Sequence, residues 1–111
     1  FQNNNDSMFD SVKFGVGVVT PEEFDVREPH CIRSHVNGEL RQDSTTDLMI
    51  FHVAYVIAEL SRGMTLLPGT IISMGTPAGV GMGFDPPKWL HPGDEVACSI
   101  EGIGTLTNTV R

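Results

Sequence analysis

The chain has 111 residues, of which 40% are apolar and 19% are charged. These fractions are typical of one globular domain or one part of a larger domain, and they exclude an intrinsically disordered chain. Fourteen acidic residues against seven basic ones give a formal net charge of −7. An acidic surface repels phosphate groups, so nucleic acid and anionic membrane surfaces are not expected partners.

The cysteines and the start of the chain indicate a cellular compartment. Cys31 and Cys98 lie far apart and form no Cys-x-x-Cys pair, so a disulfide scaffold or a structural zinc site has little support. No apolar stretch is long enough to span a bilayer, and no signal peptide is predicted at Phe1. We expect a cytoplasmic protein, with a mitochondrial location left open. The missing initiator methionine predicts a processed chain, a proteolytic product or an excerpt.

Short β-strands dominate the first part of the predicted fold. Residues 16–19 form an apolar, β-branched run that ends before Pro21, which predicts a buried strand. Residues 32–36 and 39–42 flank Asn37-Gly38, the dipeptide that best supplies the two positive φ angles of a type I′ turn. We therefore expect a β-hairpin around this turn.

One helix follows the hairpin, and further strands follow the helix. Thr45 or Thr46 is a candidate helix cap, and a dense apolar pattern predicts a helix that is most secure over residues 53–61. Turn signals then separate three further predicted strands, over residues 70–74, 94–100 and 105–110. The expected fold class is mainly β, a mixed β-roll or partial barrel with one helix.

The glycine-rich loop over residues 75–83 is the most unusual stretch of the sequence. It contains Gly75-Thr76-Pro77 and three further glycines, which permit special φ angles and close approach of a ligand to the backbone. Exposed amides and the Thr76 hydroxyl would suit a carboxylate or a phosphate. On spacing alone, a wide turn between two strands is the favoured interpretation, and a binding loop is the alternative. The pattern matches neither a Walker loop nor a dinucleotide-binding fingerprint.

Other chemically active side chains have simpler interpretations. The four histidines never recur at the spacing of a helical zinc site, and the acidic residues between Pro21 and Pro29 are typical of a solvated loop. Asp43 and Asp47 are placed to complement a helix start. No serine lies in a Gly-x-Ser-x-Gly elbow, so serine hydrolase chemistry is not predicted.

Three ordered segments resemble the fumarylacetoacetate hydrolase family. These are residues 36–42, residues 61–69 and residues 75–81, and the likeness continues through Pro86-Pro87, residues 92–94, residues 100–104 and Asn108. The resemblance covers roughly Val18 to Arg111. It implies a β-roll catalytic domain, usually dimeric, in which Mg²⁺ or Mn²⁺ chelates a 2-oxo acid or β-diketone substrate. The implied chemistry is C–C hydrolysis, decarboxylation, hydration or tautomerisation through an enolate.

The resemblance transfers site residues at only a few positions. Gly75, Thr76 and Pro77 match the family's substrate-binding loop, with the Thr76 hydroxyl expected to bind a carboxylate or oxo oxygen. The family's metal ligands, two glutamates and an aspartate, precede the matched region, so we expect no metal ligand in this chain. A catalytic lysine precedes a Phe-Asp pair in the family. Ungapped counting from Phe9-Asp10 places Ser7 there, and Lys13 is the nearby lysine candidate.

Two functional hypotheses remain open at this point. Residues 1–15 are expected to be a divergent or flexible segment, and residues 16–111 part of a family catalytic domain. In the first hypothesis, the chain is the C-terminal portion of a family enzyme, nearly inactive alone, that works as a homodimer or with the missing N-terminal half. In the second, it is a truncated, non-catalytic member that serves as a dimerisation or small-acid-binding module.

Overall fold

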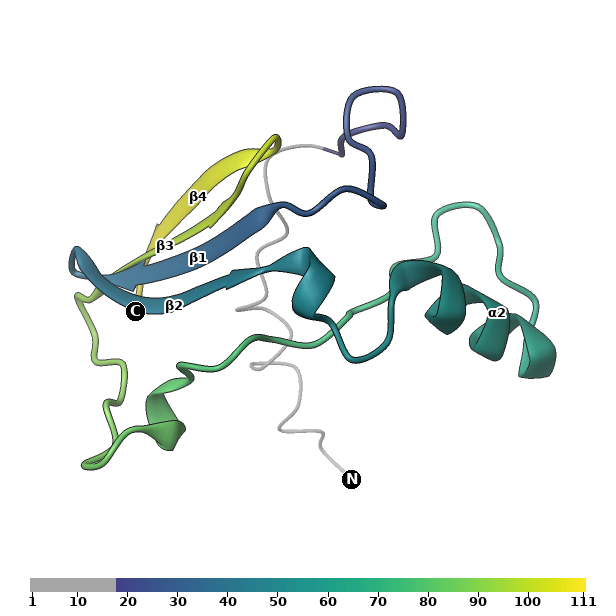
Figure 1. The fold of residues 1–111 in the computed structure, drawn as a ribbon. Helices are drawn as coiled ribbons and strands as arrows, with labels where there is room; N and C mark the ends of the chain where they lie inside the picture. The colour runs from purple at the N-terminus through teal and green to yellow at the C-terminus, as the bar shows by residue number, and fades with distance from the viewer. Residues whose placement is uncertain (1–17) are drawn as a thin grey trace.

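The computed structural model describes residues 18–111 (Figure 1). Four strands form one antiparallel sheet in the order β2-β1-β3-β4. The elements in chain order are β1 (Cys31–Val36), β2 (Glu39–Thr45), the 3₁₀ turn η1 (Thr46–Leu48), α2 (Val53–Gly63), the 3₁₀ turn η2 (Gly81–Gly83), β3 (Glu95–Ile100) and β4 (Gly104–Thr109). The predicted fold class, mainly β with one α-helix, is confirmed for this part of the chain.

The β1–β2 hairpin forms around the predicted dipeptide. Asn37 has a φ of 51° and Gly38 a φ of 79°, as a type I′ turn requires. The Asn37 side chain also ties the turn to the next strand, because its Nδ2 donates to Asp94 Oδ1 at 2.8 Å and its Oδ1 accepts from the Glu95 amide at 2.8 Å. The turn therefore fixes both the hairpin register and the position of β3.

The strands predicted near the C-terminus are confirmed within one residue at each end. β3 pairs with β1 on one side and with β4 on the other, so β1 and β3 are the two inner strands of the sheet. β2 and β4 are the edge strands. One edge of β2 is thus left without a strand neighbour within the described residues, and the glycine-rich loop approaches this strand.

The predicted helix is confirmed as α2, but its predicted cap is wrong. Thr45 ends β2, and Thr46 begins the separate turn η1 instead of capping α2. The residue that precedes α2 is His52, which makes no side-chain capping bond. The apolar periodicity predicted the position of the helix correctly. The cap could not be predicted in this way, because β2 extends to Thr45 and the turn η1 separates it from α2.

One predicted strand is wrong, and another is absent over the half of it that the structure describes. Residues 70–74 have no strand geometry, and Val18 and Val19, the described part of the predicted strand 16–19, have none either. Val18 is 96% exposed, so it is not buried as expected. A strand needs a neighbour for its backbone groups, and the described residues place none beside these two segments.

Few side chains are buried in the described part of the chain. Val36 is its one buried apolar residue, and Ser34 its one buried polar residue, both on β1. Large apolar side chains are instead exposed along the connection from η1 through α2 and beyond. They include Leu48, Ile50, Phe51, Tyr55, Met64, Leu67 and Ile71. The sheet is organised by its backbone pairing, while much of the apolar surface around α2 has no cover from residues 18–111.

No helix within residues 18–111 has the length and apolar character needed to cross a bilayer.

Candidate functional site

The glycine-rich loop is attached to the sheet through one side chain of β2. Gln42 Nε2 donates to the Thr76 hydroxyl oxygen at 2.8 Å and to the Pro77 carbonyl oxygen at 2.8 Å. Gln42 Oε1 accepts a hydrogen bond from Ser34 Oγ at 2.8 Å. Ser34 lies directly opposite Gln42 in the β1–β2 register. A chain of side-chain hydrogen bonds thus leads from the buried face of β1 to the loop.

A β-bulge next to Gln42 lets the loop approach β2 closely. Ser34 pairs with Gln42 but His35 pairs with Leu40, so Arg41 is the extra residue. Gly79 packs against the Arg41 carbonyl so tightly that a Cβ on Gly79 would lie 2.0 Å from that oxygen. Gly79 also has a φ of +104°. Glycine is therefore required at this position both for space and for backbone conformation.

An ion pair holds the far end of the loop to the same strand. Lys88 pairs with Glu39 at the start of β2, and its ammonium group lies 4.8 Å from the centre of the Phe84 ring. The Lys88 hydrogen bond, with the nearby charge of Arg41, lowers the pKa of Glu39 below its usual value. The Lys88 amide also donates to the Gly81 carbonyl at 2.9 Å. Polar contacts of Gln42 and of Lys88 thus hold the two ends of the loop against β2.

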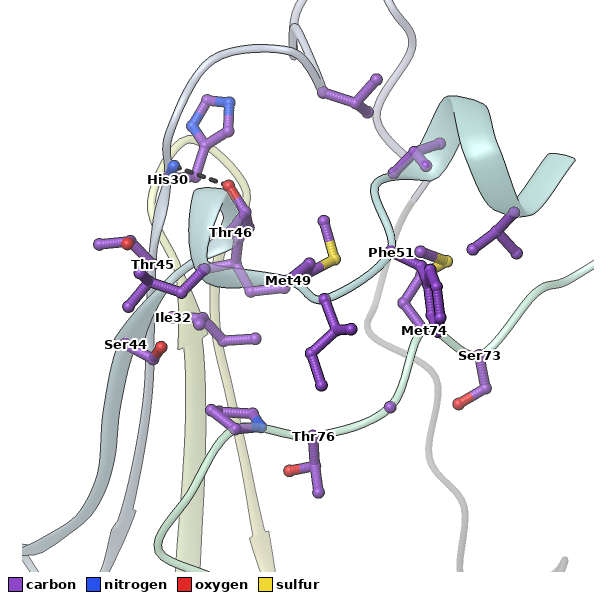
Figure 2. A pocket seen from close by; sticks show the side chains of 18 of the residues that line it. His30, Ile32, Ser44, Thr45, Thr46, Met49, Phe51, Ser73, Met74 and Thr76 are labelled. Carbon is purple, nitrogen blue, oxygen red and sulfur yellow. Dashed lines mark hydrogen bonds between the residues drawn. The ribbon is translucent and has the colours of Figure 1, made fainter. Parts of the chain in front are cut away.

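A pocket of about 650 Å³ lies between η1, the start of α2 and residues 73–77. Its lining is mainly apolar, with Ile32, Met49, Phe51 and Met74 among the lining residues (Figure 2). At one side the His30 amide donates to Thr46 Oγ1 at 3.0 Å, the bond drawn dashed in Figure 2. The pocket therefore offers space to an apolar group but few polar partners.

Thr76 lies at the margin of this pocket. Figure 2 shows its side chain pointing away from Met49 and Phe51, while Thr76 is itself one of the lining residues. Thr76 and Gly75 are both exposed. Gly75 has a φ of +93°, and nothing within 4 Å would meet a Cβ there. The loop thus leaves Thr76 and the Gly75 backbone open to a ligand at the margin of the apolar pocket.

The backbone around Thr76 adds further donors. The amides of Gly75 and Thr76 donate to no backbone carbonyl within the described residues, and Pro77 has no N–H group. Two amides and one hydroxyl suit an anionic or carbonyl oxygen better than a cation. Of the two interpretations of this loop, its exposed donors favour the binding loop.

The remaining predicted candidates are scattered or outside the described residues. Lys13, the lysine candidate, falls in residues 1–17, which lie outside the described part. His30 stacks on Phe24 with ring centres 4.0 Å apart, and its Nε2 lies 2.7 Å from the Asp25 carbonyl oxygen, so it has a structural role. Asp43 does not begin a helix as expected but lies in β2, paired with Arg33 at 2.7 Å.

The described residues do not fit a divalent metal ion. Within residues 18–111, no three histidine, cysteine, aspartate or glutamate side chains come together as a metal site would require. A hard cation such as Mg²⁺ needs several oxygen ligands around one point. Residues 18–111 therefore do not supply a complete ligand set for such an ion.

Sequence reasoning missed the role of Gln42. It recognised the segment 36–42 only as a hairpin and as part of a resemblance. A strand residue that follows a bulge residue carries no sequence signal of a contact with a loop more than thirty positions later. The one available signal was the polar Gln42 within a segment that also resembles the family.

The comparisons with known proteins point to one family. A family model described as the C-terminal domain of fumarylacetoacetate hydrolase matches residues 4–111. An uncharacterized protein of Staphylococcus aureus is 48% identical over 96 residues, which cover 86% of this chain and 32% of that protein.

Two solved structures show the same arrangement. A fumarylacetoacetate hydrolase from Exiguobacterium antarcticum is 49% identical, with a TM-score of 0.80 over 84% of this chain and 33% of its own. A 2-hydroxyhepta-2,4-diene-1,7-dioate isomerase from Mycobacterium marinum is 48% identical, with a TM-score of 0.65 over 74% of this chain and 30% of its own. The chain spans about a third of the length of these relatives.

Proposed function

Because this chain belongs to the fumarylacetoacetate hydrolase family, we propose that it forms the C-terminal part of a catalytic site that acts on a 2-oxo acid or a β-diketone. The single observation that carries the proposal is the exposed donor set at Gly75 and Thr76, held on β2 by Gln42. The names of the two relatives support the substrate class, because both substrates carry carboxylates and a keto or enol oxygen.

In this proposal Thr76 binds the substrate and takes no proton from it. Its hydroxyl donates to a carboxylate or oxo oxygen, and the amides of Gly75 and Thr76 add donors to the same anionic group. Donors that are fixed before the substrate arrives stabilise negative charge as it develops on an oxygen, which is what an enolate-forming reaction needs. The open space at Gly75, where a Cβ would meet nothing within 4 Å, leaves room for that group next to the backbone.

The proposal includes a divalent cation, Mg²⁺ or Mn²⁺, supplied with its ligands by residues outside the described part. Such an ion would supply Lewis-acid chemistry. Lys13 stays the candidate for a proton-transferring group. The choice between hydrolysis, decarboxylation, hydration and tautomerisation rests on residues outside this loop, since the fold of the family serves more than one reaction.

The exposed apolar side chains around α2 form a surface that another part of the protein can cover. The relatives are about three times as long as this chain, and the described residues leave Phe51, Tyr55 and Ile71 at least half exposed. We propose that the remaining part of a family catalytic domain packs there, with a homodimer as the assembled form. Apolar burial at a rate of about 25 cal/mol per Å² would supply the driving force.

The test is an activity assay on the intact purified polypeptide that carries this sequence, after its mass has been measured. The substrates are acetylpyruvate, which is both a 2-oxo acid and a β-diketone, and oxaloacetate, each assayed once with excess chelator and once with added Mg²⁺. The expected result is turnover with Mg²⁺ that the chelator abolishes. Binding of these acids without any turnover would contradict the enzyme and favour the non-catalytic module.

A further inference from the structure

We propose that Gln42 is a positioning residue for this site, which fixes the Thr76 hydroxyl as a hydrogen-bond donor toward the substrate. The inference rests on the proposed function, because it names how the same site recognises an acceptor. The Gln42 side chain lies in the sheet and contacts the loop, and it does not line the pocket. The direction of the hydrogen bonds made by the Gln42 side-chain amide supports this role.

The orientation of the Gln42 amide follows from its partners. The Pro77 carbonyl can only accept, so the Gln42 atom 2.8 Å away from it must be the NH₂ group. The Gln42 carbonyl oxygen then faces Ser34, whose hydroxyl donates to it at 2.8 Å. Ser34 is buried, with 9% of its surface exposed. Both ends of the amide therefore agree on one orientation.

This orientation decides what the Thr76 hydroxyl can do. The NH₂ group has two hydrogens, one for the Pro77 carbonyl and one for Thr76 Oγ1 at 2.8 Å. Because Thr76 Oγ1 already accepts from Gln42, its own proton is left to donate. A hydroxyl used in this way favours a ligand that offers an acceptor, such as a carboxylate or oxo oxygen, because its proton is free and only one of its two lone pairs remains for a donor.

The network also limits where that proton can point. The bulge at Arg41 and the close contact with Gly79 hold the loop against β2, so Gln42 reaches Thr76 across a fixed gap. Hydrogen bonds in such a chain polarise one another, which strengthens the outer donor. The Ser34–Gln42–Thr76 chain thus connects the buried face of β1 to the substrate oxygen.

The test is a double-mutant cycle with Gln42→Met and Thr76→Val in the intact protein, with acetylpyruvate as substrate. Met keeps the unbranched length of Gln but donates nothing. We expect Q42M to raise KM about tenfold with a smaller change in kcat. We expect T76V to raise KM at least as much, and the double variant to be no worse than T76V, because Gln42 acts only through the Thr76 hydroxyl.

Two further variants separate positioning from folding. Asp43→Asn changes the next residue of β2, outside the network, and should leave both kinetic constants unchanged. Gln42→Glu keeps the size of the side chain but removes both donors, so its KM should rise as in Q42M or further. Thermal unfolding of each variant is measured alongside the kinetics. A variant that does not fold is replaced by Ser34→Ala, which removes only the hydroxyl that donates to Gln42 Oε1 and fixes the orientation of the amide.

The outcomes distinguish this inference from the proposed function. If T76V raises KM but Q42M does not, or if the two effects multiply in the double variant, the positioning role is overturned and the substrate site stands. If T76V leaves the kinetics unchanged, the proposed role of Thr76 fails and the inference fails with it. If the protein turns over no substrate, the same cycle is measured as binding of pyruvate by calorimetry, with the same expected pattern in Kd.

Discussion

The sheet and the connection from residue 49 to residue 90 are stabilised in different ways. In the sheet, β1 to β4 pair through their backbones, and a turn with two positive φ angles sets the register. The connection has little regular structure apart from α2 and η2, and many of its large apolar side chains are exposed. Its loop is nevertheless placed on β2, by Gln42, by the Arg41 bulge and by the Lys88–Glu39 pair.

The candidate site therefore depends on a few polar contacts with β2 more than on a packed core. A rigid sheet supplies the fixed side, and a glycine-rich loop supplies the donors. Substitutions in the sheet should therefore change stability, whereas substitutions where the loop meets β2 should change function first.

The largest expected effect belongs to Gly79→Ala. The new Cβ would lie 2.0 Å from the Arg41 carbonyl, at a φ of +104°, so the loop must move away from β2. A displacement of about 1 Å at a binding group can lower turnover roughly 100-fold. Steady-state kinetics of the intact protein would measure the loss.

Gly83→Ala is the matched control for Gly79→Ala. Gly83 lies in η2 of the same loop, and its Cβ would meet only Val80 Cγ2 at 3.7 Å, which is ordinary van der Waals contact. Its kinetics should stay close to those of the unchanged protein. Equal losses in both variants would show that the close approach to Arg41 is not what places the loop.

In the sheet, Gly38→Val should lower stability and leave the loop chemistry intact. Gly38 has a φ of 79° with nothing near its Cβ, so the cost is conformational and amounts to about 1–2 kcal/mol. Gly38→Asn should cost less, because asparagine tolerates positive φ. Urea unfolding would compare the two, and a Val variant as stable as the Asn variant would refute the turn assignment.

A smaller effect is expected for the ion pair between the first two strands. Arg33 Nε and Asp43 Oδ1 are 2.7 Å apart, but the two side chains are 48% and 50% exposed. Exposed pairs contribute roughly 0.2–1 kcal/mol. Asp43→Asn should therefore shift the free energy of unfolding by no more than that amount, and a larger loss would mean that water screens this pair less than its exposure implies.

The smallest effect concerns acid conditions. A hydrogen bond from the Arg27 side chain to the exposed Asp25 carboxylate lowers the pKa of Asp25 to about 2. Because this folded-state pKa lies below the ordinary value of 3.8, the stabilisation is present above pH 3.8 and is lost as the pH falls through about 2. In Arg27→Ala the pKa should return toward 3.8, as carboxyl carbon NMR would show. An unchanged pKa would exclude Arg27 as the cause.

The predictions that succeeded from the sequence depended on local chemistry. Asn37-Gly38 permits few turns, so the hairpin followed, and the apolar period over residues 53–61 identified α2. The strand predicted over residues 70–74 failed because β-branched composition shows a preference but supplies no pairing partner. Thr76 stays a candidate that the sequence proposes through its loop, whereas the contact of Gln42 with Thr76 required the fold, since only the sheet brings residues 42 and 76 together.

In the proposed site, the Thr76 hydroxyl lies on a loop attached to β2 and binds the acid or oxo oxygen of the substrate. The most direct measurement is kcat/KM of Thr76→Val against the unchanged intact protein, with acetylpyruvate in magnesium buffer. Valine keeps the shape and removes the hydroxyl, so we predict a loss corresponding to about 1–3 kcal/mol, with unchanged thermal stability. Equal kcat/KM in the two proteins would contradict the claim and remove Thr76 from the site.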